Sequence, residues 1–167
     1  PPAAIRHRGG QVEHGRLPDP GHAGHDDAAA VAGLGAVQSV TQGVPDLPPT
    51  AAPAELSSAR EAETQARESA KSLLALGINA VLGPVVDVGS SEAGSALGSR
   101  VYSDSPEEVA TYADKVVRAY RAEHVFSSAA HFPGLGATDQ STEDGPATVG
   151  LGLDELRQRD LVAFRSA

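Results

Sequence analysis

The sequence predicts an α/β fold with a parallel sheet, because segments with strand and helix patterns alternate along residues 55–167. Two short runs, 78–82 and 125–130, are expected to be strands, and residues 125–128 are β-branched or aromatic enough for a buried one. A helical repeat of small apolar residues precedes the first run, and a helix-capping signal at Ser105 stands between the two. We expect the two runs to be adjacent parallel strands with helices packed outside them.

The first helix is expected over residues 55–76. Apolar residues recur there at steps of three and four, with Glu, Arg, Gln and Lys between them: Leu56, Ala59, Ala62, Ala66, Ala70, Leu73 and Leu74. Gly77 follows as the C-terminal cap. The strand at 78–82 comes next, and the pair Gly83-Pro84 is expected to end it.

The second helix is expected over residues 106–122. Ser105-Pro106-Glu107-Glu108 has the pattern of a capping box with proline at the first helical position. The buried stripe of this helix is expected to contain Val109, Ala113, Val116, Val117 and Tyr120. A third helix, over about 153–166, is expected to bury Leu156, Leu161 and Phe164.

The segment His131-Phe132-Pro133-Gly134-Leu135-Gly136 directly follows the strand at 125–130 and begins a polar loop. In parallel α/β folds, ligands bind at the edge where strands end and such loops begin. We therefore expect His131 to lie at a ligand-binding edge.

Four segments, in matching order, resemble the glycoside hydrolases of family 3, and in particular their β-N-acetylglucosaminidase branch. Residues 131–136 resemble the signature KHFPGHG, and residues 77–88 resemble the strand and loop GINxNxAPVxDV. Residues 100–107 resemble RxFxxDPE, and residues 153–164 resemble a helix that ends in DLxPF. The resemblance implies that residues 55–167 are part of a (β/α)8 TIM-type barrel.

A complete barrel of this type takes about 250 residues, so the remainder is expected C-terminal to this chain. The sequence contains no methionine and opens Pro1-Pro2, and we therefore do not expect residue 1 to be the native start.

The resemblance implies hydrolysis of terminal β-linked sugars, N-acetylglucosaminides foremost, by a retaining mechanism without metal or other cofactor. The family's nucleophilic Asp lies on a later strand, so the nucleophile is expected to be absent from this chain, and the chain alone is expected to be inactive. The acid/base of this branch belongs to an Asp-Ser-His triplet, which corresponds here to Ser141-Thr142-Glu143. Glu143 is therefore the candidate acid/base, because a carboxylic acid with a raised pKa can protonate a leaving oxygen.

The alternative for this loop is an inert, solvated acidic segment formed by Asp139, Glu143 and Asp144. Asp160 is the last acidic residue of the chain, and its helical setting predicts a surface or capping residue.

His131 and Arg100 are the candidate substrate-binding residues, since each matches a sugar-contacting residue of the family. The alternative for His131 is a structural role in which it fastens the loop to the backbone. Arg100 could equally pair with Asp87 or Asp104 and hold its own loop. The family's Lys before this His is Ala130 here, so a catalytically degenerate relative that binds glycan or cell-wall fragments, or a scaffold, remains an alternative function.

Residues 1–54 form a separate irregular segment rich in Pro, Gly, Ala and His. Residues 6–12 resemble the family's DxEGGxV barrel loop, although Arg6 and Arg8 replace its acids. His22 and His25 have possible metal-ligand spacing, but no predicted helix or strand holds that spacing, and we expect no metal site.

The net charge of −9 and the 4% aromatic content argue against a nucleic-acid partner. No apolar run approaches the roughly 20 residues of a membrane span, and without cysteine the chain has no disulfides or thiolate metal ligands. These features leave the compartment and the oligomeric state open, with the cell envelope or secretion favoured over the cytoplasm.

Overall fold

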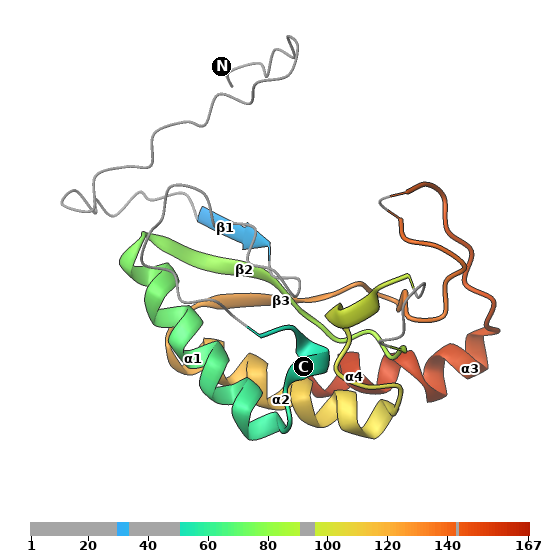
Figure 1. Ribbon diagram of the computed structural model, residues 1–167, viewed down its shortest axis with the longest axis horizontal. Helices are drawn as coiled ribbons and strands as arrows, with labels where there is room; N and C mark the ends of the chain where they lie inside the picture. Colours follow the sequence, from blue (N-terminus) through green and yellow to red (C-terminus); the bar gives the residue numbers. More distant parts are fainter. Residues whose placement is uncertain (1–29, 34–50, 91–95, 143) are drawn as a thin grey trace, which may run out of the picture.

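The computed structural model describes residues 30–33, 51–90, 96–142 and 144–167. Three strands form one sheet in the order β1–β2–β3, and the main helices cover one of its faces (Figure 1). The strands are β1 (Ala30–Gly33), β2 (Ile78–Val85) and β3 (Phe126–Ala130). Both strand pairs are parallel. The prediction that the runs at 78–82 and 125–130 are adjacent parallel strands is therefore confirmed.

Strand β1 lies inside the segment that the sequence marks as irregular. It pairs with β2 from Ala30 opposite Ile78 to Gly33 opposite Leu82. Four small residues are too few to show either an alternating or a continuous apolar pattern, and for that reason the sequence did not reveal this strand. The segment 6–12 and the pair His22 and His25 lie outside the described residues, and the boundary between residues 54 and 55 stays a prediction.

Strand β2 continues to Val85, so the prediction that Gly83-Pro84 ends it is wrong. The ladder to β3 is irregular at this point, because Leu82 and Gly83 both lie opposite Ser128. Proline cannot donate to a ladder, and within a central strand it is tolerated where a bulge interrupts the pairing. The bulge therefore carries the strand past the Gly-Pro pair.

Helix α1 spans Ala59–Ala75 and begins later than the predicted residue 55. Ser58 is its N-cap, and the Ser58 hydroxyl accepts a hydrogen bond from the Glu61 backbone N–H. A short 3-10 helix, η1 (Pro53–Glu55), precedes α1. The first residue of α1 is therefore set by the Ser58 cap and not by the repeat of apolar residues. At the other end Gly77 has φ of +78°, which confirms the predicted glycine cap.

Helix α2 spans Pro106–Ala122, as predicted. The Ser105 hydroxyl accepts from the Glu108 backbone N–H, which forms one half of the predicted capping box. The other half is relayed, since the Ser105 backbone N–H donates to the Ser103 hydroxyl, which itself donates to the Glu108 carboxylate. The predicted buried stripe is confirmed except at one position, where Ala119 is buried and Val117 is only half-buried.

The third predicted helix is two helices, α3 (Leu153–Gln158) and α4 (Asp160–Ser166). The helix is interrupted at Arg159, whose φ of −108° and ψ of −78° depart from the values of a regular α-helix. The three apolar residues expected to be buried there, Leu156, Leu161 and Phe164, are only half-buried. Asp160, predicted to be a surface or capping residue, lies in the first turn of α4 but is not at the surface, since its exposure is 1%. The break at Arg159 turns Asp160 and Ala163 inward.

The core lies between the sheet and its helices. One apolar cluster joins α1, β2 and α2, and a second joins the end of β2 to α2 and α4 through Val86, Val88, Val109, Ala113 and Ala163. A second short 3-10 helix, η2 (Gly98–Arg100), lies in the long connection between β2 and α2.

The opposite face of the sheet is open in the described part of the chain. Leu82 is 57% exposed and Phe126 is 69% exposed. The prediction that residues 125–128 form a buried strand is therefore wrong for β3, because the covering helices lie on one face only. None of the described helices is both long and apolar enough to cross a membrane.

Candidate functional site

The candidate site is organised around Asp87, which follows the end of β2 and is completely buried. One carboxylate oxygen, Oδ2, accepts a hydrogen bond from the His131 backbone N–H at 3.1 Å and lies 2.7 Å from His131 Nδ1. The other oxygen, Oδ1, accepts from the Leu135 backbone N–H at 2.7 Å. A buried carboxylate needs such partners, and here they tie the loop after β3 to the residue that follows β2.

The contact with Asp87 sets the hydrogen-bonding role of the His131 ring. An ionised carboxylate only accepts hydrogen bonds, so toward an ionised Asp87 the ring donates from Nδ1, which leaves Nε2 as an acceptor whenever the ring is neutral. The side chain is 38% exposed, in contrast to its buried partner. His131 is therefore held by a side-chain carboxylate and not only by backbone, and it remains accessible from solvent.

A shallow pocket, partly open to solvent, lies beside this pair. It is lined by residues of two connections, the one after β2 and the one after β3: Ala96, Leu97, Arg100, His131, Leu135, Thr138, Ser141 and Thr142. The structure thus brings together Arg100 and His131, the two candidate substrate-binding residues. The enclosed space of the pocket is only about 20 Å³, room for about one water molecule, so a larger ligand would have to occupy the open side.

Arg100 ends η2, and its guanidinium folds back on its own loop. Its Nε donates to the Leu97 carbonyl at 3.3 Å and its Nη2 donates to the Ala96 carbonyl at 3.4 Å. These contacts fix the direction of the planar guanidinium, which presents its donors in a rigid fork.

Gly136 allows the loops after β2 and β3 to touch. A Cβ at residue 136 would lie 1.8 Å from the Val88 carbonyl oxygen, and one at Gly89 would lie 3.2 Å from Gly136 Cα. The final glycine of the segment 131–136 is thus needed for the close approach of two backbones. This approach holds Leu135 and His131 next to the residues that follow β2.

Residues 138–142 and 144–149 extend beyond the end of the sheet before α3 (Figure 1). An antiparallel bridge joins Thr138 to Val149. Asp139 closes the segment, because its backbone N–H donates to the Thr148 carbonyl and its carboxylate accepts from the Thr148 N–H. Asp139 is therefore a structural residue of the loop. Glu143, the candidate acid/base, lies outside the described residues.

Asp160 is a second buried carboxylate close to the first. Burial raises the pKa of Asp160, the neighbouring Arg159 opposes that shift, and the negative charge of Asp87 raises the pKa further. Within the described part of the chain, no three His, Cys, Asp or Glu side chains gather closely enough to hold a metal ion.

A family model described as the glycosyl hydrolase family 3 N-terminal domain matches residues 27–167. The chain belongs to family 3. A β-hexosaminidase from Stenotrophomonas maltophilia is 33% identical to this family 3 chain over 138 residues, which is 79% of the chain and 41% of that protein. The chain spans between 16% and 41% of the length of the first three curated relatives that it matches.

Solved structures agree with this family assignment. A family 3 β-N-acetylglucosaminidase from Paenibacillus superposes with a TM-score of 0.69 and 30% identity, covering 80% of this chain and 25% of that one. A family 3 glycosyl hydrolase from Mycobacterium smegmatis superposes with a TM-score of 0.66 and 29% identity, covering 71% of this chain and 37% of that one. The resemblance inferred from the four sequence segments is therefore confirmed.

Two features of this family 3 site were missed by the sequence argument. Asp87 was considered only as a partner for Arg100, whereas it holds His131 and Leu135. Its position at the end of the segment 77–88, directly after an apolar strand, was the available signal. The burial of Asp160 had no such signal, because one acid at the start of a helix normally faces water.

Proposed function

We propose that this chain is part of the (β/α)8 barrel of a family 3 enzyme that hydrolyses terminal β-linked N-acetylglucosaminides by a retaining mechanism. The parallel strands with helices on one face support the barrel. The curated relatives named β-hexosaminidase and the solved β-N-acetylglucosaminidase support the reaction and the sugar. The substrate is a carbohydrate, and no nucleic acid takes part.

The observation that carries this proposal is the pocket shared by His131 and Arg100. Both parallel strands run toward this pocket, since Asp87 and His131 follow their C-terminal ends. Active sites of (β/α)8 barrels lie at that end of the strands. A sugar hydroxyl would meet the ring of His131, oriented by Asp87, and the guanidinium of Arg100 on a neighbouring loop.

We assign the acid/base role to Glu143 and place the nucleophile outside residues 1–167. Ser141 and Thr142, the two residues before Glu143, line the pocket, which supports a role for this loop beside the sugar. A retaining glycosidase needs two carboxyl groups about 5–5.5 Å apart, one as nucleophile and one as acid/base.

The test is hydrolysis of a chromogenic β-N-acetylglucosaminide by the protein that carries this chain. We expect turnover that is lost in Glu143→Gln and strongly reduced in His131→Ala. Glu107→Gln, which changes an exposed acid at the start of α2, is the matched control and should leave turnover unchanged. Turnover that survives Glu143→Gln would refute the assignment of the acid/base.

A glycan-binding protein without activity is the second candidate. The specific observations in its favour are Ala130 and Ser141, which stand where the family's Lys and Asp are expected. Binding of N-acetylglucosamine without turnover by the same protein would favour this candidate. A protein that neither binds nor hydrolyses the sugar would refute both.

A further inference from the structure

Arg159 and Asp160 lie at the junction of α3 and α4. They contact the loop after β2 and the loop after β3, which both line the pocket. The Arg159 guanidinium donates from Nη1 to both carboxylate oxygens of Asp160, at 3.1 Å and 3.0 Å. Its Nη2 donates to the Val88 carbonyl, which belongs to the residue next to Asp87. One arginine therefore connects the start of α4 to the loop after β2.

Asp160 reaches the other loop through Gly134. A Cβ at residue 134 would lie 2.6 Å from the Cβ of Asp160 and 2.7 Å from its Oδ1. Gly134 has φ of +131°, a conformation that residues with a side chain rarely adopt. Its backbone N–H donates to the His131 carbonyl at 2.8 Å, so the turn that rests on Asp160 is the turn that begins at His131.

The two carboxylates thus hold the same loop at different points. Asp87 accepts from the backbone and ring of His131 and from the Leu135 N–H, while Asp160 supports Gly134 between them. Both acids are buried, with exposures of 0% and 1%. In the Arg159–Asp160 pair the acid is buried and the arginine side chain is 29% exposed. A carboxylate that is removed from water needs such a partner, and this partner also binds the loop after β2.

We infer that Arg159 and Asp160 are positioning residues of the sugar site, which act through Gly134 and Val88 to hold the Asp87–His131 pair in its binding geometry. That the ligand is a sugar rests on the proposed function, whereas the orientation of His131 does not depend on it. Neither residue lines the pocket, so neither is a catalytic residue.

The experiment compares Asp160→Asn with wild type in the protein that carries this chain. Asparagine keeps the shape against Gly134 and removes the charge that Arg159 binds. The control is Asp154→Asn, which breaks an exposed Asp–Arg pair with Arg157 on the adjacent helix. The readouts are the nitrogen NMR signals of the His131 ring, which report its tautomer, and titration with N-acetylglucosamine.

We expect Asp160→Asn to shift the ring-nitrogen signals of His131 away from the Nδ1–H tautomer and to weaken sugar affinity about tenfold. At metal sites, removal of a residue that orients a ligand-binding side chain lowers affinity about 10- to 100-fold, and we take the low end of that range here. Asp154→Asn should change neither readout. If Asp160→Asn does not fold, Arg159→Lys replaces it, because lysine keeps the charge but cannot bind two oxygens and a carbonyl in one plane.

Unchanged ring-nitrogen signals in the folded variant would overturn the inference. Shifted signals with unchanged affinity would also overturn it, because the pair would then serve the fold and not the site. A wild-type protein that binds no sugar would refute the proposed function, while the ring-nitrogen comparison would still decide whether Arg159 and Asp160 orient His131.

Discussion

Asp87 and His131 lie 44 positions apart in the sequence and form the closest side-chain contact of the site. The carboxylate is buried and the imidazole is half exposed, so the first can orient the second without itself reaching a ligand. A neutral His131 with its hydrogen on Nδ1 presents Nε2 as an acceptor for a sugar hydroxyl. Asp87 therefore orients the ring, and His131 is the residue of this pair that can contact a ligand.

We expect His131→Ala to weaken the binding of N-acetylglucosamine by about 1–3 kcal/mol, the usual cost of leaving a buried partner unsatisfied. Stability should fall less than affinity, because the His131 and Leu135 backbone N–H groups still bind Asp87. Calorimetric titration beside thermal melts measures both. The control is His124→Asn, an exposed histidine before β3 whose φ of 62° suits asparagine. A loss of stability with unchanged affinity would show that His131 only fastens the loop.

Gly136→Ala tests the contact between the two loops. The new Cβ would lie 1.8 Å from the Val88 carbonyl oxygen, so one backbone must move. We expect the free energy of unfolding to fall by about 1–3 kcal/mol, as for other overpacked sites. Gly150→Ala is the matched control, because its Cβ would meet nothing within 4 Å, and its effect should stay within about 0.5 kcal/mol. Equal urea midpoints for the two variants would contradict the close approach.

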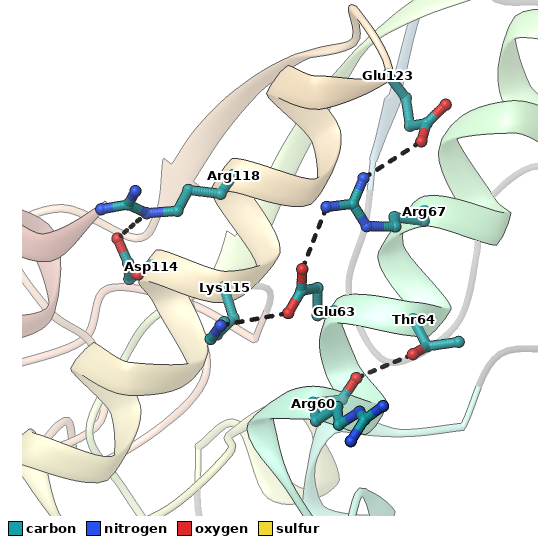
Figure 2. Close-up of polar contacts among 8 residues, drawn as sticks. All are labelled: Arg60, Glu63, Thr64, Arg67, Asp114, Lys115, Arg118 and Glu123. Atoms are coloured by element: carbon teal, nitrogen blue, oxygen red, sulfur yellow. Dashed lines mark hydrogen bonds and ion pairs between the residues drawn. The ribbon is translucent and has the colours of Figure 1, made fainter.

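At the scale of elements, α1 and α2 pack side by side, and a chain of ion pairs crosses their outer surface (Figure 2). Glu63 contacts Arg67 at 3.1 Å along α1 and Lys115 at 3.4 Å on α2. Arg67 also contacts Glu123, at the end of α2, at 3.4 Å. A single surface ion pair contributes little to stability, because ordering two long side chains costs entropy. In this network Glu63 and Arg67 each contact two partners, so the network contributes more than an isolated pair.

The hydrogen bond from Arg67 lowers the pKa of Glu63 below its usual 4.5, with a further contribution from the positive charge of Lys115. A carboxyl whose pKa is lowered on folding stabilises the fold above pH 4.5, and this contribution is lost as the pH falls through the folded pKa. We therefore expect Glu63→Gln to lower the urea midpoint at neutral pH and to have no effect in acid. High salt should also reduce the difference.

The control for this pH dependence is Glu68→Gln, which changes an exposed acid on the same helix. A Glu63→Gln effect that is equal at neutral and acidic pH would show that the carboxylate charge does not hold the two helices together.

At the scale of the whole molecule, the sheet is covered by helices on one face and carries exposed Leu82 and Phe126 on the other. In the proposed barrel this second face would point to the interior, which is filled by side chains of the other strands. The described strands β2 and β3 form a parallel sheet with helices on one face, the arrangement that a wall of the proposed barrel would have.

We expect residues 1–167 by themselves to show no hydrolysis of β-N-acetylglucosaminides, because the proposed nucleophile lies outside them. The measurement is release of a chromogenic leaving group over long incubation, with an active family 3 enzyme as the positive control. Turnover by this chain that is abolished by one substitution within residues 1–167 would show that the nucleophile has been misplaced.

The sequence alone determined those features that depend on neighbours within about one helical turn. Ser105 and Pro106 start α2, and Gly77 ends α1, because capping groups meet backbone groups three or four residues away. The segment 131–136 with its three companions was enough to identify family 3, because these motifs preserve residue types at short spacings.

Only the tertiary structure decided which distant residues meet. The bulge at Gly83 that extends β2 exists because the strand pairs with β3, and the pairing of β1 with β2 likewise depends on a partner far along the chain. The contacts of Asp87 with His131 and of Asp160 with Gly134 follow from the register of parallel strands and the break at Arg159. Local sequence patterns carry no record of that register, because it is set by packing between elements.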